Sequence, residues 1–140
     1  MSVTTAVHLN FRGRAREALE FYRSVFGGHL LAVTYADAHA VQRPDEADQV
    51  MWGEVRSEGG FHVMAYDVPA SRDHDAGVDP VFVSVRGRDE DEVRRYWDGL
   101  CTDATVRAPL APAAWALLYG MVTDRFGVTW VLDVPAPYTP

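Results

Sequence analysis

Two amino acids are missing from this 140-residue chain. It has no lysine and no isoleucine, so all 13 basic residues are arginine, a bias typical of GC-rich bacterial genomes. Its single cysteine, Cys101, cannot form an internal disulfide, which agrees with a reducing compartment. No apolar run approaches the roughly 18 residues of a membrane span, and Met1-Ser2-Val3 opens no signal peptide. We therefore expect a cytoplasmic protein without a membrane partner.

Positive charge is scarce as well. The formal net charge is −7, and since nucleic acids bind basic surfaces, we expect no nucleic-acid partner. With 48% apolar and 24% charged residues, the chain can bury one core but not two independent ones. We therefore expect a single domain over residues 1–140.

The chain repeats itself. The apolar spacing of Phe11, Leu19, Tyr22 and Phe26 recurs 74 positions later, and the stretch from Trp52 to Gly60 is echoed 67 positions later by that from Tyr119 to Gly127. Duplicated units of this size usually surround a shared cavity. We predict one module at about 1–68, a linker at 69–78 and a second module at about 79–134.

Each module reads as a strand, a helix and three strands. In the first, alternation predicts strands at 6–11, 29–35, 50–55 and 61–67, and an apolar stripe ending at Gly27-Gly28 predicts a helix. The segment 36–49 reads as a surface loop or a lid, the loop being favoured. In the second, Asp89 starts a helix. Strands are predicted at 81–85, near 105–107, at 117–122 and at 128–134, and Pro109 and Pro112 are expected to break the chain.

These motifs resemble a known family. The runs Asn10-Phe11-x-Gly13, Phe21-Tyr22-x-x-x-Phe26-Gly27-Gly28 and Asp124-Arg125-Phe126-Gly127-Val128-x-Trp130 resemble the vicinal oxygen chelate (glyoxalase/bleomycin resistance/dioxygenase) superfamily, and more narrowly its PhnB-like branch. The resemblance covers essentially the whole chain. It implies an α+β fold of two βαβββ modules in an incomplete barrel around a cavity, and usually a homodimer.

The resemblance also implies four positions at which the family holds a divalent ion. Counted from the strand ends and turn glycines, these positions are Ala6, Met64, Pro80 and Val131. None of these side chains offers the imidazole, carboxylate or thiolate that such an ion needs. We therefore expect no metal and no cofactor.

Strand alternation then indicates what faces the cavity, because residues two apart share a face. The expected lining combines aromatic, thioether and polar groups, which suits a small organic molecule. The candidate ligand-binding residues are His8, Asn10, Trp52, His62, Met64, Tyr66, Phe82 and Ser84. The alternative is a small dry core closed by the same side chains.

Three functions are compatible with this lining. The favoured one is a metal-free protein that sequesters or carries an apolar or aromatic metabolite or drug. The second is a glyoxalase-type isomerase or lyase that uses His8, Glu54, His62 and Tyr66 as acid–base groups, or His8, His62 and Glu54 as an atypical metal site. The third is a dimeric structural domain without a ligand. With each of the three functions we expect a homodimer whose interface includes Trp115 and Pro109-Leu110.

Overall fold

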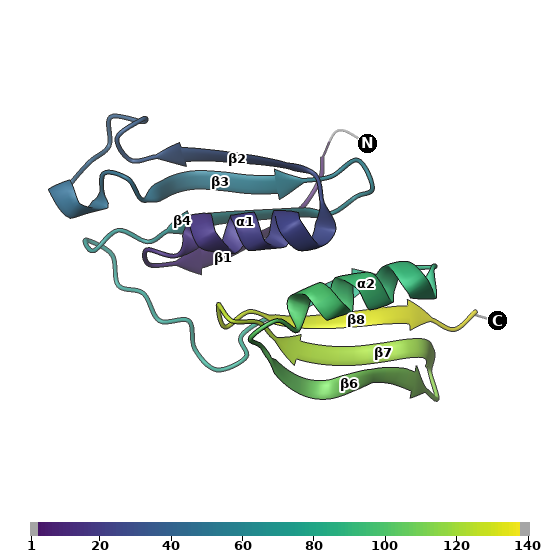
Figure 1. Ribbon diagram of the computed structural model, residues 1–140. Coiled ribbons are helices and arrows are strands. Elements are labelled where there is room, and N and C mark those ends of the chain that lie inside the picture. Colours follow the sequence, from purple (N-terminus) through teal and green to yellow (C-terminus); the bar gives the residue numbers. More distant parts are fainter. Residues whose placement is uncertain (1–2, 138–140) are drawn as a thin grey trace. The chain divides into compact units, whose positions relative to one another are not determined.

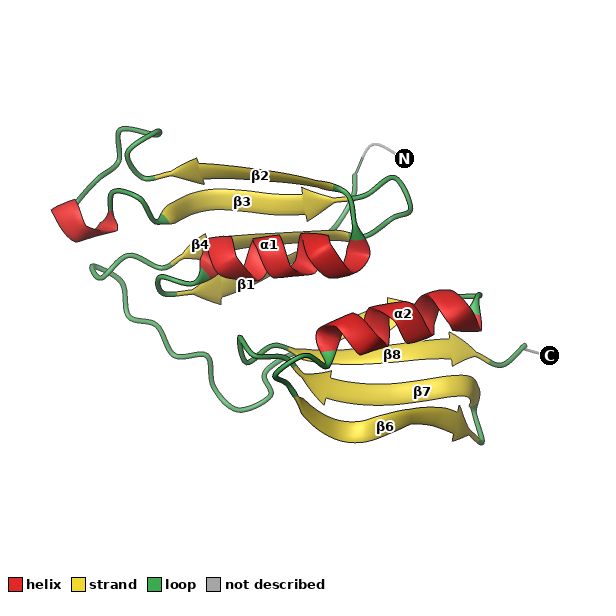
Figure 2. Cartoon of the chain, viewed as in Figure 1, coloured by secondary structure: helices red, strands yellow, loops and turns green. Residues whose placement is uncertain are grey.

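The computed structural model describes residues 3–137 and divides into two compact units between Ala76 and Gly77 (Figure 1). Each unit holds one α-helix and one four-stranded mixed sheet (Figure 2). The predicted α+β class and the two βαβββ units are confirmed. The eight strands form two separate sheets, so they are not closed into a barrel. No helix within residues 3–137 is long and apolar enough to cross a membrane.

The first unit contains sheet A, with strand order β1-β4-β3-β2. β1 is parallel to β4, and the other neighbours are antiparallel. Its elements are β1 (Val7–Phe11), α1 (Ala15–Phe26), β2 (His29–Thr34), the 3₁₀ helix η1 (Pro44–Glu46), β3 (Val50–Arg56) and β4 (His62–Asp67).

The second unit contains sheet B, with strand order β5-β8-β7-β6. β5 is parallel to β8, and the remaining pairs are antiparallel, so the topology of the first unit is repeated. Its elements are β5 (Val83–Arg86), α2 (Glu90–Leu100), β6 (Thr105–Ala113), β7 (Ala116–Thr123) and β8 (Thr129–Pro135).

Both helices begin and end on local signals in the sequence. α1 buries a stripe that includes Ala18, Leu19 and Tyr22, and it ends at Gly27, whose φ of 78° favours glycine. α2 begins where the Asp89 carboxylate accepts hydrogen bonds from the amides of Asp91 and Glu92. The predicted stop and the predicted cap are therefore both confirmed.

Asp67, at the end of β4, ties three segments of the first unit together. One carboxylate oxygen accepts hydrogen bonds from the amides of Gly13 at 2.7 Å and Ala15 at 3.0 Å, and the other accepts one from the amide of Val50 at 2.9 Å. The first two amides lie at the start of α1, where backbone donors lack partners within the helix. A single buried carboxylate thus holds α1 and β3 against β4.

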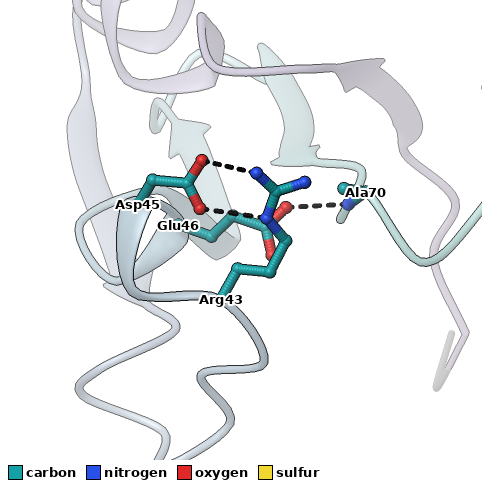
Figure 3. A network of polar contacts seen from close by, with 4 residues as sticks. All are labelled: Arg43, Asp45, Glu46 and Ala70. Atoms are coloured by element: carbon teal, nitrogen blue, oxygen red, sulfur yellow. Dashed lines mark hydrogen bonds and ion pairs between the residues drawn. The ribbon is translucent and has the colours of Figure 1, made fainter.

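The segment 36–49 is a mostly exposed loop that is anchored by one buried carboxylate (Figure 3). Glu46, in η1, accepts a hydrogen bond from the amide of Ala70 at 2.8 Å. Next to it, the Arg43 guanidinium donates to both carboxylate oxygens of Asp45, at 3.2 and 3.0 Å. Glu46 therefore ties this segment to the chain that follows β4.

Two sequence-based expectations for the second unit are wrong. β5 starts at Val83 rather than Val81, because its partner strand β8 begins only at Thr129 and the pairing of the two strands starts at Trp130. β6 runs through Pro109 and Pro112 instead of breaking there. β6 is an edge strand whose pairing with β7 shifts register three times, and such an edge tolerates residues that cannot donate.

Candidate functional site

The candidate site lies on the face of sheet A that is turned away from α1, here called the open face. In β1, Leu9 and Phe11 are buried, whereas His8 and Asn10 are exposed. α1 covers the opposite face (Figure 1), and Gly53 lies against Leu19 of this helix. The strand phase predicted for β1 is therefore confirmed.

The register of the four strands orders the open face into three rows, because paired residues in a sheet point to the same side. The pairs His62–Arg56 and Arg56–His29 define a basic row. The pairs His8–Met64, Met64–Glu54 and Glu54–Leu31 define a central row. The pairs Asn10–Tyr66 and Trp52–Val33 define an aromatic row. Because Gly53 pairs with Ala65, Tyr66 lies opposite Trp52, and the two pairs belong to the same row.

Six of the eight predicted ligand-binding residues lie together on this face. They are His8, Asn10, Trp52, His62, Met64 and Tyr66. The other two, Phe82 and Ser84, belong to the second unit. Ser84 is in β5, whereas Phe82 precedes that strand and lies under the guanidinium of Arg107, 5.9 Å from its ring centroid.

The closest polar contact on the open face joins Glu54 and His62. Glu54 Oε2 lies 2.6 Å from His62 Nε2, and both side chains are mostly buried. Because a carboxylate can only accept, the imidazole donates through Nε2–H, which leaves Nδ1 without a partner among residues 3–137. Glu54 therefore orients the ring as carboxylates orient catalytic or ligating histidines.

His8 is engaged elsewhere and does not join this pair. Its Nδ1 lies 3.0 Å from Asn10 Oδ1, and its ring meets Tyr66 edge to face at a centroid distance of 5.2 Å. In the central row, Met64 lies between His8 and Glu54. The four candidate acid–base groups therefore form two separate pairs, His8 with Tyr66 and His62 with Glu54.

The donor set does not fit the divalent ion that the sequence resemblance implies. Ala6, Pro80 and Val131 offer no ligand atom, and Met64 offers only a thioether. The alternative set of His8, His62 and Glu54 is not assembled either, since His8 faces Asn10. Within the described part of the chain, no group of three or more His, Cys, Asp or Glu side chains is placed to hold a metal.

Sequence reasoning missed Arg56. Its guanidinium belongs to the basic row, 3.8 Å from Glu54 Oε2, and its side chain is 62% exposed. Alternation from Trp52 and Glu54 along β3 would have placed Arg56 on the same face. Sequence reasoning also missed Arg86 of β5, although alternation along that strand would have shown the face on which it lies. It forms an ion pair with Asp133 of β8, with Nε and Oδ1 3.1 Å apart.

Comparisons with known proteins agree with this fold. The sequence of residues 6–132 matches the family model of the glyoxalase/bleomycin resistance protein/dioxygenase superfamily. The chain therefore belongs to this superfamily.

Individual relatives match along nearly the whole chain. Protein YjdN of Escherichia coli is 25% identical over 91% of this chain and 92% of its own. The crystal structure of PA1353 from Pseudomonas aeruginosa is 30% identical with a TM-score of 0.83, covering 96% of this chain and 98% of that one. A PhnB protein from Bacillus cereus is 21% identical with a TM-score of 0.72, covering 94% and 99%. The predicted resemblance to the superfamily is confirmed, whereas membership of its PhnB-like branch stays a prediction.

Proposed function

We propose that this protein binds a small apolar or aromatic molecule, a metabolite or a drug, on the open face of sheet A, and that it sequesters or carries this molecule. One observation supports this above all. Six residues selected from the family's ligand positions and strand alternation fall on one face, in contiguous positions across β1, β4 and β3. The superfamily includes bleomycin resistance proteins, so the fold is compatible with this role.

The chemistry of the face supports an aromatic ligand. Trp52, Met64 and Tyr66 are partly buried and neighbour one another across β3 and β4. Aromatic and thioether groups provide a large contact area with dispersion and stacking interactions. Asn10 and His8 add hydrogen-bonding groups at the edge of this surface. A mostly apolar surface with a few polar groups is typical of small-molecule sites. Ligand contact by Phe82 and Ser84 stays a prediction.

We further propose that binding does not depend on a metal ion. The residues at the four family positions lack suitable donor atoms. A reaction that needs a Lewis acid at those positions would therefore have no ion to polarise its substrate.

A second candidate function, acid–base catalysis, is favoured by the Glu54–His62 contact. A carboxylate-oriented imidazole with a free Nδ1 is suited to accept a proton from a bound substrate. If this function operates, His62→Gln would abolish turnover while leaving ligand affinity within about threefold. If the protein only carries its ligand, both the wild type and His62→Gln would bind the ligand without catalytic turnover.

The proposed partner besides the ligand is a second copy of the chain. Trp115, Leu117 and Val106 expose 65%, 45% and 46% of their surface around the β6–β7 hairpin, and such apolar groups commonly mark an interface. Sedimentation velocity at micromolar concentration would show a dimer, and Trp115→Glu would shift it toward the monomer. A wild-type monomer would contradict this part of the proposal.

Calorimetric titration with a panel of bicyclic aromatic compounds tests the main proposal. At least one compound would bind with a Kd below about 1 mM. Trp52→Ala would weaken it about tenfold, within the 1–3 kcal/mol of a stacking contact. Trp115→Ala removes an equally large but exposed indole outside the site and would leave affinity unchanged. Absence of binding across the panel would favour the ligand-free structural domain instead.

A further inference from the structure

We infer that the ligand is an aromatic compound carrying an anionic group, such as a carboxylate, and that Arg56 binds this group. The inference rests on the proposed function and adds the ligand's chemical class and orientation. The aromatic part would lie over the aromatic row, and the anion would lie at the basic row.

The open face is chemically asymmetric along its strands. Trp52 and Arg56 are four residues apart on β3, which places their backbones about 13 Å apart at the usual rise per strand residue. The aromatic row has no charged side chain, whereas the basic row carries Arg56 between His62 and His29. A ligand that spans the rows therefore meets apolar surface at one end and nitrogen donors at the other.

Arg56 has most of its binding capacity unused. Its guanidinium carries five N–H donors, yet its one contact with a charged group is the 3.8 Å approach to Glu54 Oε2. No further hydrogen bond or ion pair of this side chain exists among residues 3–137. A guanidinium held so loosely and so exposed can turn to form two parallel hydrogen bonds with a carboxylate.

The acidic residue of the site does not oppose this arrangement. Glu54 is the one carboxylate on the open face between the basic and aromatic rows, and His62 already occupies its Oε2 at 2.6 Å. Its side chain is 17% exposed, against 62% for that of Arg56. An incoming cation would have to approach Glu54 beside the guanidinium of Arg56, whereas an anion meets the exposed guanidinium first. The geometry therefore favours an anion over a cation.

A matched pair of probes tests this inference. Naphthalene-1-carboxylate and naphthalene-1-methanol share the ring system and differ in charge. At low ionic strength the wild-type chain would bind the carboxylate at least about tenfold more tightly, as expected for a charge-assisted bidentate contact. Arg56→Gln would remove this preference and leave the affinity for the alcohol unchanged. Arg94→Gln, an exposed arginine on α2, would leave both affinities unchanged, and circular dichroism would verify the fold of each variant.

The outcomes separate this inference from the proposed function. If both probes bind equally and Trp52→Ala weakens both, the face binds aromatic compounds and the anion inference is wrong. If the carboxylate is preferred but Arg56→Gln retains the preference, the ligand class is correct and the assignment of the anion to Arg56 is wrong. If neither probe binds at millimolar concentration, the inference fails, and the titration panel decides the proposed function by itself.

Discussion

Gly120 lies directly beneath the indole of Trp97, so close that a Cβ atom on Gly120 would be 2.8 Å from Trp97 Cζ3 and 3.0 Å from the Cα atom of Leu110. Gly53 has the same role in the first unit, where a Cβ atom would be 2.6 Å from Leu19 Cδ1. The two glycines are 67 positions apart, which is the repeat distance of the sequence. In both units the helix therefore packs against a glycine of an inner strand, β3 or β7, where no side chain separates the helix from the sheet.

This packing predicts that Gly120→Ala destabilises the protein by about 1–3 kcal/mol, the usual cost of overpacking. Gly53→Ala would cost less, because the Leu19 methyl group that it meets is the end of a flexible side chain. Urea unfolding measures both. Gly59→Ala is the control, since its nearest neighbour would be 3.8 Å away. Equal stability of Gly120→Ala and wild type would contradict the described contact with Trp97.

A second prediction concerns Asp67. Asp67→Asn replaces one of the two accepting oxygens with an NH₂ group, which cannot accept a hydrogen bond. In one orientation this group faces the amides of Gly13 and Ala15, and in the other it faces the amide of Val50. The free energy of unfolding would fall by about 2–4 kcal/mol, as for buried hydrogen bonds to a charged group. Asp48→Asn, an exposed position in the loop before β3, would change stability by less than about 0.5 kcal/mol. A similar effect of both substitutions would refute this role.

A third prediction concerns the reactivity of Cys101. Burial, with a smaller contribution from Asp98, raises the pKa of this thiol above its ordinary value of 9.0. Since the thiolate is the nucleophile, a raised pKa lowers its fraction at pH 8. Modification by an aromatic disulfide reagent at pH 8 would therefore be slower in the folded than in the urea-unfolded chain, and the rate for the folded chain would rise over a higher pH range. Asp98→Asn would accelerate it slightly. Equal folded and unfolded rates would contradict the prediction.

A fourth prediction concerns metal. Elemental analysis of protein produced without added metal would find well under one divalent ion per chain, and a chelator would leave the Tm unchanged. The reason is the donor chemistry of Ala6, Met64, Pro80 and Val131. A stoichiometric Zn, Ni, Mn or Fe signal that disappears in His8→Ala would overturn the metal-free proposal.

Much of the fold could be read from the sequence because its signals are local. The stripe of α1, the glycines that end it and the Asp89 cap depend only on residues within a few positions of each other. Alternation likewise identified the side of β1 that bears His8 and Asn10. The sequence duplication supported the predicted helices and strands, and the structure has the same strand order in each unit.

The remaining features depend on which strand lies beside which. No local feature of the sequence shows that β6 is an edge strand. The sequence therefore predicts that Pro109 and Pro112 end the strand, whereas in the structure the strand continues through both. The hydrogen bond from His62 Nε2–H to Glu54 depends on the register between β3 and β4. Alternation groups Glu54 with Trp52 on one face of β3, but it cannot choose His62 over His8 as the partner of Glu54.

The central claim is that a small aromatic molecule binds the open face of sheet A. The most direct measurement is a titration of the ¹⁵N-labelled protein with naphthalene-1-methanol, followed by amide chemical shifts. The proposal predicts saturable changes that are largest at residues 8–10, 52–54 and 62–66 and that vanish in Trp52→Ala. Saturable changes that spare β1, β3 and β4, or no changes at millimolar concentration with any compound of the bicyclic aromatic panel, would contradict it.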